Sequence, residues 1–539
     1  MNALPQPAAY AFGSFLQQQE RKSLLRFVAC GSVDHGKSTL IGRLLYESKQ
    51  VFEDQLDALA KDSRKFGTQG EALDFALLVD GLAAEREQNI TIDVAYRFFA
   101  TARRKFIVID APGHEQYTAN MATGASVADL ALALVGADEG LTRQTKRHVV
   151  ILSMLGVRKI VLAVNKMDRV GWSREAFRAI EDGFRDWAKD ISVDDIVCIP
   201  LAAKSGDNVV SRSQHMPWYR GPTLLEHLEE AEPARTSGWQ SLRMPIQWVS
   251  RPDGDFRGYS GPIASGEVHV GMPIKILPSG RVSRISRIAT FDGDLACAAA
   301  GRSVTLTFAD QVDASRGDMV VGIDGAPAVA DRIAARAFWM NSEPLLPGRN
   351  YLFKLATTTG TATIEADVST IDLDTRRPVG TDAIAQNEIG FCTLKLARPI
   401  AVERYADCKE TGSFILIDPE TYDTVGMGCV ETVFALPRPA LVPASTASSM
   451  PSTPKPKEAA AGTLARWTET HARSLAKAVS WRATGSLDTF VVALVVTGSA
   501  KLAGSVAVTE ILTKILIYYF HERIWAWVPW GKRSAQSTS

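Results

Sequence analysis

The stretch of sequence that decides the fold is a glycine-rich loop, and it reads Gly31-Ser32-Val33-Asp34-His35-Gly36-Lys37-Ser38. It follows an apolar run, residues 24–30, and leads into a helical pattern, residues 38–45. A loop of this form between a strand and a helix surrounds phosphates with its backbone amides, and its lysine reaches the β- and γ-phosphates. The helix adds the partial positive charge of its N-terminus. The stretch therefore predicts a nucleotide-binding α/β domain, and by itself it suits ATP and GTP alike.

Further apolar runs predict that this loop belongs to a parallel sheet. From residue 20 to about residue 230, short apolar runs alternate with helical patterns, which is typical of a sheet covered by helices. The runs at residues 106–109, 130–135, 160–164 and 196–200 lack polar alternation, as expected for strands buried on both faces. Ligands of such sheets bind at the carboxyl ends of the strands. Each motif described below directly follows one of these runs.

Two later motifs indicate that the nucleotide is GTP. Asp110-Ala111-Pro112-Gly113-His114 follows the run 106–109. Its carboxylate can hold a magnesium-bound water, and the Gly113 amide can sense the γ-phosphate, a contact that hydrolysis removes. Asn165-Lys166-Met167-Asp168 follows the run 160–164, and its last carboxylate can accept hydrogen bonds from N1 and N2 of guanine. Because adenine lacks this pair of donors, Asp168 carries the predicted preference for GTP.

A fourth stretch, residues 202–208, is expected to close over the base with backbone amides. The predicted GTP-binding residues are Gly31, Ser32, Val33, Asp34, His35, Gly36, Lys37, Ser38, Thr39, Asp110, Ala111, Pro112, Gly113, His114, Asn165, Lys166, Met167, Asp168, Ala202, Ala203 and Lys204.

Composition limits the class of protein. A chain of 539 residues is too long for one core, and about 150 residues per domain predicts three or four domains. Lys and Arg number 60, as do Asp and Glu, so no net charge attracts the chain to nucleic acid. The six cysteines are scattered without a Cys-x-x-Cys pair, which predicts reduced thiols in a cytosolic domain.

After the first domain, the sequence pattern changes to a β-rich region and then to a polar segment. Short β-rich stretches punctuated by glycine predict two small β-barrels, with stretches at residues 245–249, 266–270, 303–308, 351–356, 392–396 and 414–417. A segment rich in Pro, Ser, Thr, Ala and Lys then has the composition of a tether. The predicted domains are an N-terminal arm (1–20), a P-loop GTPase domain of α/β fold (21–237), two β-barrels (243–334 and 338–436), a flexible linker (437–465) and a helical hairpin tail (466–535).

The tail contains two apolar runs, residues 483–500 and 502–520. As helices they reach about 27 Å each, near the roughly 30 Å hydrocarbon thickness of a bilayer. Basic residues flank the pair on the outside, which predicts both termini in the cytoplasm and a tether to the inner membrane through residues 483–520. The charges of Asp488, Glu510 and Lys514 oppose insertion, so a soluble or surface-lying hairpin is the alternative.

Several motifs carry a family resemblance. The stretch 85–93, the Asp110–His114 motif and the β-rich region after the first domain resemble the translational-elongation-factor superfamily of GTPases. Within it, the chain resembles the GTPase subunits of bacterial ATP sulfurylase, also called sulfate adenylyltransferase. The motifs that carry this closer resemblance are Leu78–Gln88, Met216–Tyr219, Gln247–Asp253, Asp255–Tyr259, Phe291–Asp294 and Thr411–Asp418. The segment from about residue 466 resembles a small bacterial domain predicted to lie in membranes, through Ser474–Arg482 and His521–Trp525.

The resemblance implies both an activity and roles for residues. It implies a subunit that couples GTP hydrolysis to the formation of adenosine 5′-phosphosulfate and pyrophosphate from ATP and sulfate, with a separate catalytic subunit as partner. It implies GTP and Mg²⁺ as cofactors, with Ser38, Thr91 and Asp110 at the metal and His114 as the catalytic residue that positions the attacking water. The alternative is a translation-type GTPase that binds tRNA or ribosomes, and the neutral net charge disfavours it.

Three positions depart from the pattern of that family. His35 stands where the sulfurylase branch usually has aspartate, Asn89 where glycine is usual, and Ala202 where serine is usual. Asparagine tolerates positive φ better than most residues, so the Asn89 segment can still form its turn.

Overall fold

The computed structural model describes residues 22–49, 53–66, 73–79, 85, 91–233, 241–252 and 256–436. All of them belong to one compact unit, Met1–Pro439. The predicted arm, linker and hairpin tail lie outside the described residues, as does Asn89. Within the described ranges, no helix combines the length and the apolar character that crossing a bilayer requires.

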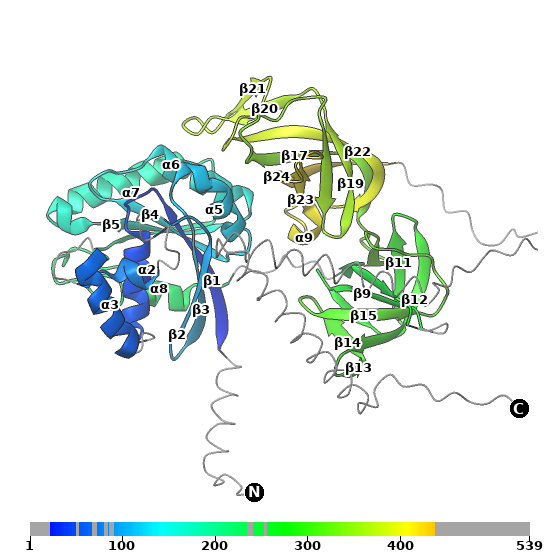
Figure 1. Cartoon of the computed structure of the whole chain (residues 1–539), viewed down its shortest axis with the longest axis horizontal. Helices are drawn as coiled ribbons and strands as arrows, with labels where there is room; N and C mark the ends of the chain where they lie inside the picture. Colours follow the sequence, from blue (N-terminus) through cyan, green and yellow to red (C-terminus); the bar gives the residue numbers. More distant parts are fainter. Residues whose placement is uncertain are drawn as a thin grey trace, which may run out of the picture. The chain divides into compact units, whose positions relative to one another are not determined.

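The first domain is built on a six-stranded sheet in the order β2-β3-β1-β4-β5-β6 (Figure 1). Five of its strands pair in parallel, as the apolar runs predict, and they are β1 (Ser23–Gly31), β3 (Arg104–Asp110), β4 (Leu130–Gly136), β5 (Lys159–Asn165) and β6 (Asp195–Pro200). The edge strand β2 (Ala95–Ala100) pairs antiparallel with β3. The apolar runs do not predict β2, because Arg97 interrupts its apolar residues, and two of these, Tyr96 and Phe98, are exposed.

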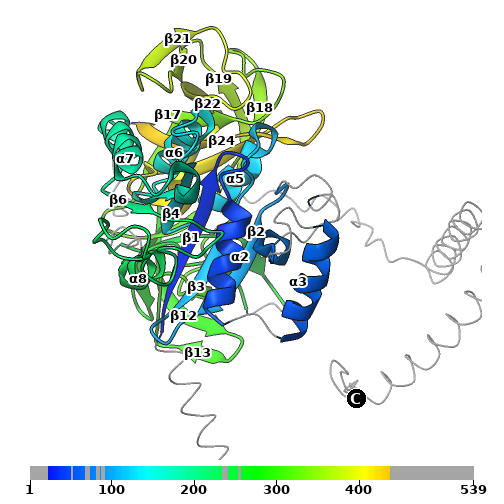
Figure 2. The same ribbon diagram turned by 90° about the vertical axis from the view of Figure 1, so that its left-hand side faces the viewer.

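Helices cover both faces of this sheet (Figures 1 and 2). One face carries α5 (Thr118–Ala125), α6 (Arg143–Met154) and α7 (Arg174–Ala188), and the other carries α2 (Lys37–Glu47) and α8 (Leu224–Glu230). The shorter described elements are α3 (Glu53–Phe66) and the 3-10 turns η1 (Phe75–Leu78), η2 (Glu115–Tyr117) and η3 (Met167–Val170). A sheet enclosed on both faces requires apolar side chains in both directions, which explains the unbroken apolar runs.

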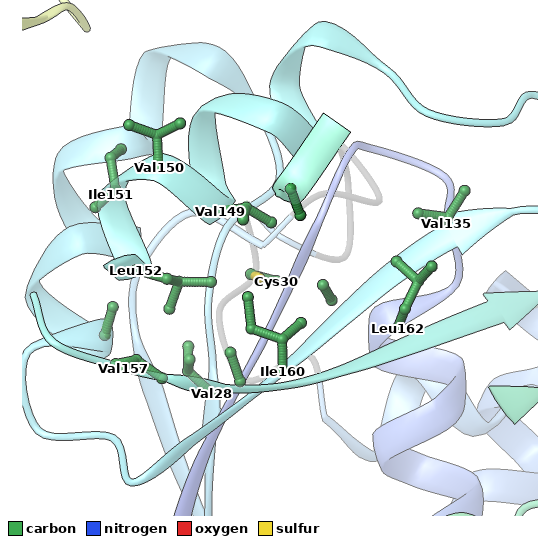
Figure 3. Close-up of a cluster of buried hydrophobic side chains, with 14 of the residues drawn as sticks. Val28, Cys30, Val135, Val149, Val150, Ile151, Leu152, Val157, Ile160 and Leu162 are labelled. Atoms are coloured by element: carbon green, nitrogen blue, oxygen red, sulfur yellow. The ribbon is translucent and has the colours of Figure 1, made fainter. Parts of the chain in front are cut away.

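The central strand β4 shows this requirement most plainly, because all seven of its residues are buried. Alternate side chains of β4 point to opposite layers: Val135 belongs to the cluster that faces α6, and Leu132 belongs to the opposite cluster. Figure 3 shows Val135 in one cluster with Leu162 of β5, Cys30 of β1 and Val149 of α6. Full burial of one such side chain stabilises a fold by about 1.5–3 kcal/mol relative to exposure.

Two β-barrels follow the first domain. The first barrel joins seven strands in the order β7-β16-β11-β12-β15-β9-β8, with β13 paired to β12 and a separate β10-β14 pair. Its strands are β7 (Arg243–Pro245), β8 (Trp248–Ser250), β9 (Gly258–Pro262), β10 (Glu267–His269), β11 (Pro273–Leu277), β12 (Arg281–Thr290), β13 (Gly293–Leu295), β14 (Cys297–Ala299), β15 (Ser303–Phe308) and β16 (Met319–Gly322).

The second barrel closes on itself, because its first strand, β17, pairs with both β24 and β22. Its elements are β17 (Ala328–Trp339), β18 (Asn350–Leu355), β19 (Thr358–Ile364), β20 (Val368–Ile371), β21 (Pro378–Thr381), β22 (Ile389–Val402), α9 (Lys409–Gly412), β23 (Ser413–Ile417) and β24 (Thr424–Ala435). All six cysteines are free, and only Cys297 is exposed.

Two details of the β-rich region differ from the predictions. The predicted stretch 245–249 is two strands, because the chain passes from a partner in β16 to a partner in β9 at Ile246 and Gln247. The predicted limits at residues 334 and 338 cut through β17, which runs unbroken from Ala328 to Trp339 within the second barrel. The second barrel thus begins no later than Ala328. Gly325 and Pro327 directly precede β17 and mark this passage as a turn. The predicted limit at residue 334 overlooked this signal, because β17 continues the β-rich texture beyond it.

A buried ion pair joins the two barrels. Arg243 of β7 and Glu403, which follows β22, have side chains that are only 1% and 7% exposed, and their closest nitrogen–oxygen distance is 2.8 Å. The Thr411 hydroxyl also donates to Glu403, at 2.9 Å. A buried ion pair is costly to break from one side, because the remaining charge stays in a medium that solvates it poorly.

We predict that Glu403→Gln lowers the free energy of unfolding of the barrels by about 3–5 kcal/mol, since Arg243 then remains buried without a carboxylate. The control is Glu365→Gln, which removes the partner of the exposed Arg332 in the second barrel and costs less than about 1 kcal/mol. Urea denaturation followed by circular dichroism measures both. Equal losses in the two variants would contradict the prediction.

Candidate guanine-nucleotide site

The predicted motifs meet at one edge of the six-stranded sheet. The phosphate loop leaves the end of β1, the Asp110 motif the end of β3, the Asn165 motif the end of β5, and the closing loop follows β6. Because these strands run parallel within one sheet around β4, their carboxyl ends lie at the same edge. The fold therefore brings together segments that are far apart in the sequence, from Gly31 to Ala202.

The phosphate loop is shaped by residues with positive φ. Asp34 and Gly36 have φ of 62° and 86°, and α2 begins at Lys37 directly after them. Since glycine has no side chain to bond the amides of the first helical turn, those amides and the helix dipole remain for an anion. The Lys37 ammonium donates to the carbonyls of Gly31 and Ser32, at 3.2 Å and 2.9 Å.

Charge at Lys37 suits a phosphate ligand. Burial lowers the pKa of Lys37 below its ordinary value, and the nearby Asp110 carboxylate opposes that shift. Asp110 is itself only 1% exposed. A polyphosphate beside Lys37 brings the negative charge that stabilises a buried ammonium, so the loop favours anionic ligands over neutral ones.

His35 holds the loop against the sheet. Its ring is fully buried, with Nδ1 3.0 Å from the Leu134 carbonyl of β4 and Nε2 3.3 Å from Glu139. Burial lowers the pKa of His35, although Leu134 and Glu139 oppose the shift. Since a carbonyl only accepts, Nδ1 is the donor. The side chain at this unusual position thus contacts β4 rather than the phosphate side of the loop.

Asn165 connects the phosphate loop with the closing loop. Its Nδ2 donates to the His35 carbonyl at 2.8 Å, and its Oδ1 accepts from the Ala203 amide at 2.9 Å. The side chain is buried, and a Cβ on Gly36 would lie 2.5 Å from Nδ2. Glycine is therefore required at position 36 both for its φ and for this close approach.

The remaining base-side residues lie next to Asn165. Asp168 is exposed at the start of η3, where a ligand can reach its carboxylate. Lys166 has a φ of 62°, and its ammonium lies 3.8 Å from Asp138 and 3.7 Å from Glu139. Ala202 is fully buried, and its amide donates to the Asp207 carbonyl at 3.2 Å, so the closing loop turns without the usual serine.

The Asp110 segment packs directly against the phosphate loop. A Cβ on Gly113 would lie 2.3 Å from the Lys37 ammonium and 2.7 Å from the Gly31 carbonyl. His114 caps η2, and its Nδ1 accepts from the Gln116 amide at 3.3 Å. The ring is thereby oriented with Nε2 away from the turn that it caps.

Two residues without a role assigned from the sequence hold the segment after Thr91. Glu85 is buried, and its Oε1 accepts from the Ile92 amide at 3.1 Å. Asn120 of α5 donates to the Ile92 carbonyl at 2.9 Å. Glu85 lies within the 85–93 motif, whereas no sequence signal marks Asn120, because its partner is 28 positions away.

Comparison with known proteins agrees with this arrangement. The family described as "Elongation factor Tu GTP binding domain" matches residues 22–234, and "GTP-eEF1A C-terminal domain-like" matches residues 332–431. Sulfate adenylyltransferase subunit 1 of Methylorubrum extorquens is 52% identical over 442 residues, which cover 82% of this chain and 94% of the relative. The chain belongs to the sulfate adenylyltransferase subunit 1 family.

Other comparisons extend the family assignment. Subunit 1 of Aeromonas hydrophila subsp. hydrophila is 52% identical, over 77% of this chain and 88% of the relative. The bifunctional enzyme CysN/CysC of Xylella fastidiosa is 50% identical, over 78% of this chain and 67% of the relative. Residues 475–526 match a family described as "Predicted membrane protein (DUF2061)". A solved structure of sup35 complexed with GDP is 22% identical with a TM-score of 0.35, covering 76% of this chain and 94% of that one, which is too low a score to add to the assignment.

We predict that Asn165→Ala weakens GDP binding about 10- to 100-fold, because it leaves the Ala203 amide and the His35 carbonyl without their buried partner. A fluorescent GDP analogue measures the dissociation constant. Asn350→Ala, which removes an exposed amide from the second barrel, is the matched control. A dissociation constant within about twofold of the wild-type value would contradict the role assigned to Asn165.

Proposed function

We propose that the chain is the GTP-hydrolysing subunit of ATP sulfurylase. In this role it couples GTP hydrolysis to the formation of adenosine 5′-phosphosulfate and pyrophosphate from ATP and sulfate, on a separate catalytic subunit. The observation that carries the proposal is membership of the subunit 1 family over 94% of a relative's length, together with four nucleotide motifs at one sheet edge. The designation of these relatives as subunit 1 supports a hetero-oligomer.

Different residues at the sheet edge bind different parts of the nucleotide. The amides of residues 31–37 and the Lys37 ammonium hold the phosphates, and Asp168 reads the guanine edge. Asn165 sets the distance between these two parts. The 202–204 backbone closes over the base.

The donors at this edge fit Mg²⁺, which prefers hydroxyl, carboxylate and phosphate oxygens. Ser38 lies in the first turn of α2, and the buried Asp110 ends the neighbouring strand β3. We assign Ser38 and Thr91 as hydroxyl ligands and Asp110 as the acceptor for a metal-bound water. When bound, Mg²⁺ neutralises charge that develops on the transferred phosphoryl group.

His114 is assigned as the residue that positions the attacking water. It directly follows Gly113, which lies against the phosphate loop, so we expect its ring on the γ-phosphate side of the site. Its Nδ1 is engaged by the Gln116 amide, which leaves Nε2 for the water. If His114 has this role, its loss should slow GTP hydrolysis and leave the affinity for GTP unchanged.

The proposal predicts that GTP stimulates adenylylsulfate formation when the purified chain is mixed with a catalytic subunit of sulfate adenylyltransferase. A non-hydrolysable GTP analogue should bind without that stimulation. His114→Ala should keep GTP affinity and slow GTP hydrolysis by about 100-fold. His269→Ala, at an exposed position of the first barrel, should change neither quantity. No stimulation by GTP, together with binding of tRNA, would favour the translation-type alternative.

We further propose that residues 483–520 tether the chain to the inner membrane, with the first domain and barrels in the cytoplasm. The match of residues 475–526 to a family described as a membrane protein supports this placement. Full-length protein should sediment with membranes, and a truncation after residue 440 should stay in the supernatant with the same GTPase rate. Recovery of both proteins in the supernatant would contradict the tether.

A further inference from the structure

The two segments that flank the predicted guanine position are joined by a cluster outside the motifs. The segment with Asp168 continues through η3 to Trp172, and the closing loop continues from Ala202 to His215. Trp172 lies four positions after Asp168, within the same tight turn, because its amide donates to the Met167 carbonyl at 2.9 Å. A displacement of Trp172 therefore moves the turn that carries Asp168.

Trp172 is held in an unfavourable backbone conformation. Its φ is 60°, a left-handed value that is uncommon for a bulky residue and persists only where neighbouring contacts impose it. Two contacts do so here. The Trp218 indole donates to the Trp172 carbonyl at 3.1 Å, and the His215 ring stacks on the Trp172 ring with centroids 4.6 Å apart and planes inclined by 15°.

His215 is in turn fixed to the closing loop through Asp207. Its Nδ1 lies 3.1 Å from Asp207 Oδ1, and the side chain of Asp207 is only 9% exposed. Asp207 also accepts from the hydroxyls of Ser213 and Ser205, at 2.5 Å each. Burial alone raises the pKa of Asp207, but these hydrogen bonds outweigh it, and the pKa lies below its ordinary value. The carboxylate is thus a charged and well-satisfied anchor.

We propose that Trp172, Asp207 and His215 are positioning residues that set how strictly the site selects guanine. The inference rests on the proposed function of the site. Selection of guanine requires the Asp168 carboxylate to reach the N1 and N2 donors at once, so it depends on the angle of the turn as well as on the carboxylate. The stack of His215 on Trp172 fixes that angle relative to the loop that covers the base.

If the cluster has this function, its disruption should change how well the site discriminates between GDP and a close analogue, and not only how tightly it binds GDP. Inosine diphosphate (IDP) lacks the 2-amino group of GDP, so the ratio of the two dissociation constants reports the second hydrogen bond to Asp168. In the wild-type chain we expect GDP to bind about tenfold more tightly than IDP, or better, since a hydrogen bond to a charged acceptor is at stake. A loosened turn should bring the two constants closer together.

The experiment measures both dissociation constants by competition with a fluorescent GDP analogue, using the full chain. Trp172→Ala and His215→Ala should each lower the IDP-to-GDP ratio by about threefold or more. Trp172→Phe and His215→Phe keep a ring in the stack and should largely preserve the ratio. His215 has a side chain that is 58% exposed, so its variants are expected to fold.

The matched control is Trp187→Ala. Trp187 is a buried indole of α7 in the same domain, and it donates to the Leu373 carbonyl of the second barrel. Its loss should lower stability and leave the ratio unchanged. If the alanine variants weaken GDP and IDP equally, or change neither, the positioning role is overturned while the GTP site stands. If the wild-type chain itself does not prefer GDP to IDP, the proposed guanine site is overturned as well.

Discussion

Backbone pairing among parallel strands that are buried on both faces is the constraint on which the site depends. Such strands can satisfy their amides and carbonyls only in register with their neighbours. The register of β1 with β3 and β4, and of β5 with β4 and β6, makes their carboxyl ends coincide at one edge. The loops that follow these strands therefore lie close together at that edge. The apolar core fixes the strands, and the strands fix the positions from which the polar loops begin.

At that edge, the loops are held together by hydrogen bonds between side chains and backbone groups. The side-chain amide of Asn165 joins the phosphate loop to the closing loop. The Lys37 ammonium donates to two carbonyls of its own loop. Gly36 and Gly113 allow approaches that any Cβ would prevent. The loop that is expected to hold the phosphates and the loop that is expected to cover the base are therefore linked by one buried side chain, Asn165.

The site is also linked to the second barrel. Asn387, which precedes β22, donates to the carbonyl of Glu115 at 3.1 Å, directly after the segment that is expected to sense the γ-phosphate. Trp187 of α7 donates to the Leu373 carbonyl at 2.9 Å, and Arg376 pairs with Asp190 at 2.7 Å. A movement of residues 110–117 on hydrolysis must break or carry along the Asn387 contact. The second barrel thus contacts the segment that is expected to move on hydrolysis.

Some features of the fold could be predicted from short stretches of sequence, and others could not. Residues 24–30 and 160–164 predict strands correctly, because burial on both faces leaves an unbroken apolar run that can be read locally. The phosphate loop and Asp168 were recognisable for a similar reason, since each chemistry needs particular residue types at short spacing. The split of residues 245–249 was not predictable, because a change of strand partner leaves no compositional mark. The start of β17 at Ala328 follows the turn residues Gly325 and Pro327, a local signal that the predicted limit overlooked.

By itself, the sequence determined the fold class, the GTP motifs and the family resemblance, all of which depend on residues close together in the chain. Only the tertiary structure decided that His35 contacts β4, that Glu85 and Asn120 hold the segment after Thr91, and that His215 stacks on Trp172. Those contacts join residues up to 99 positions apart, as in the bond between His35 and Leu134. Such pairings are created by the packing of whole elements, so no short stretch of sequence contains the information that specifies them.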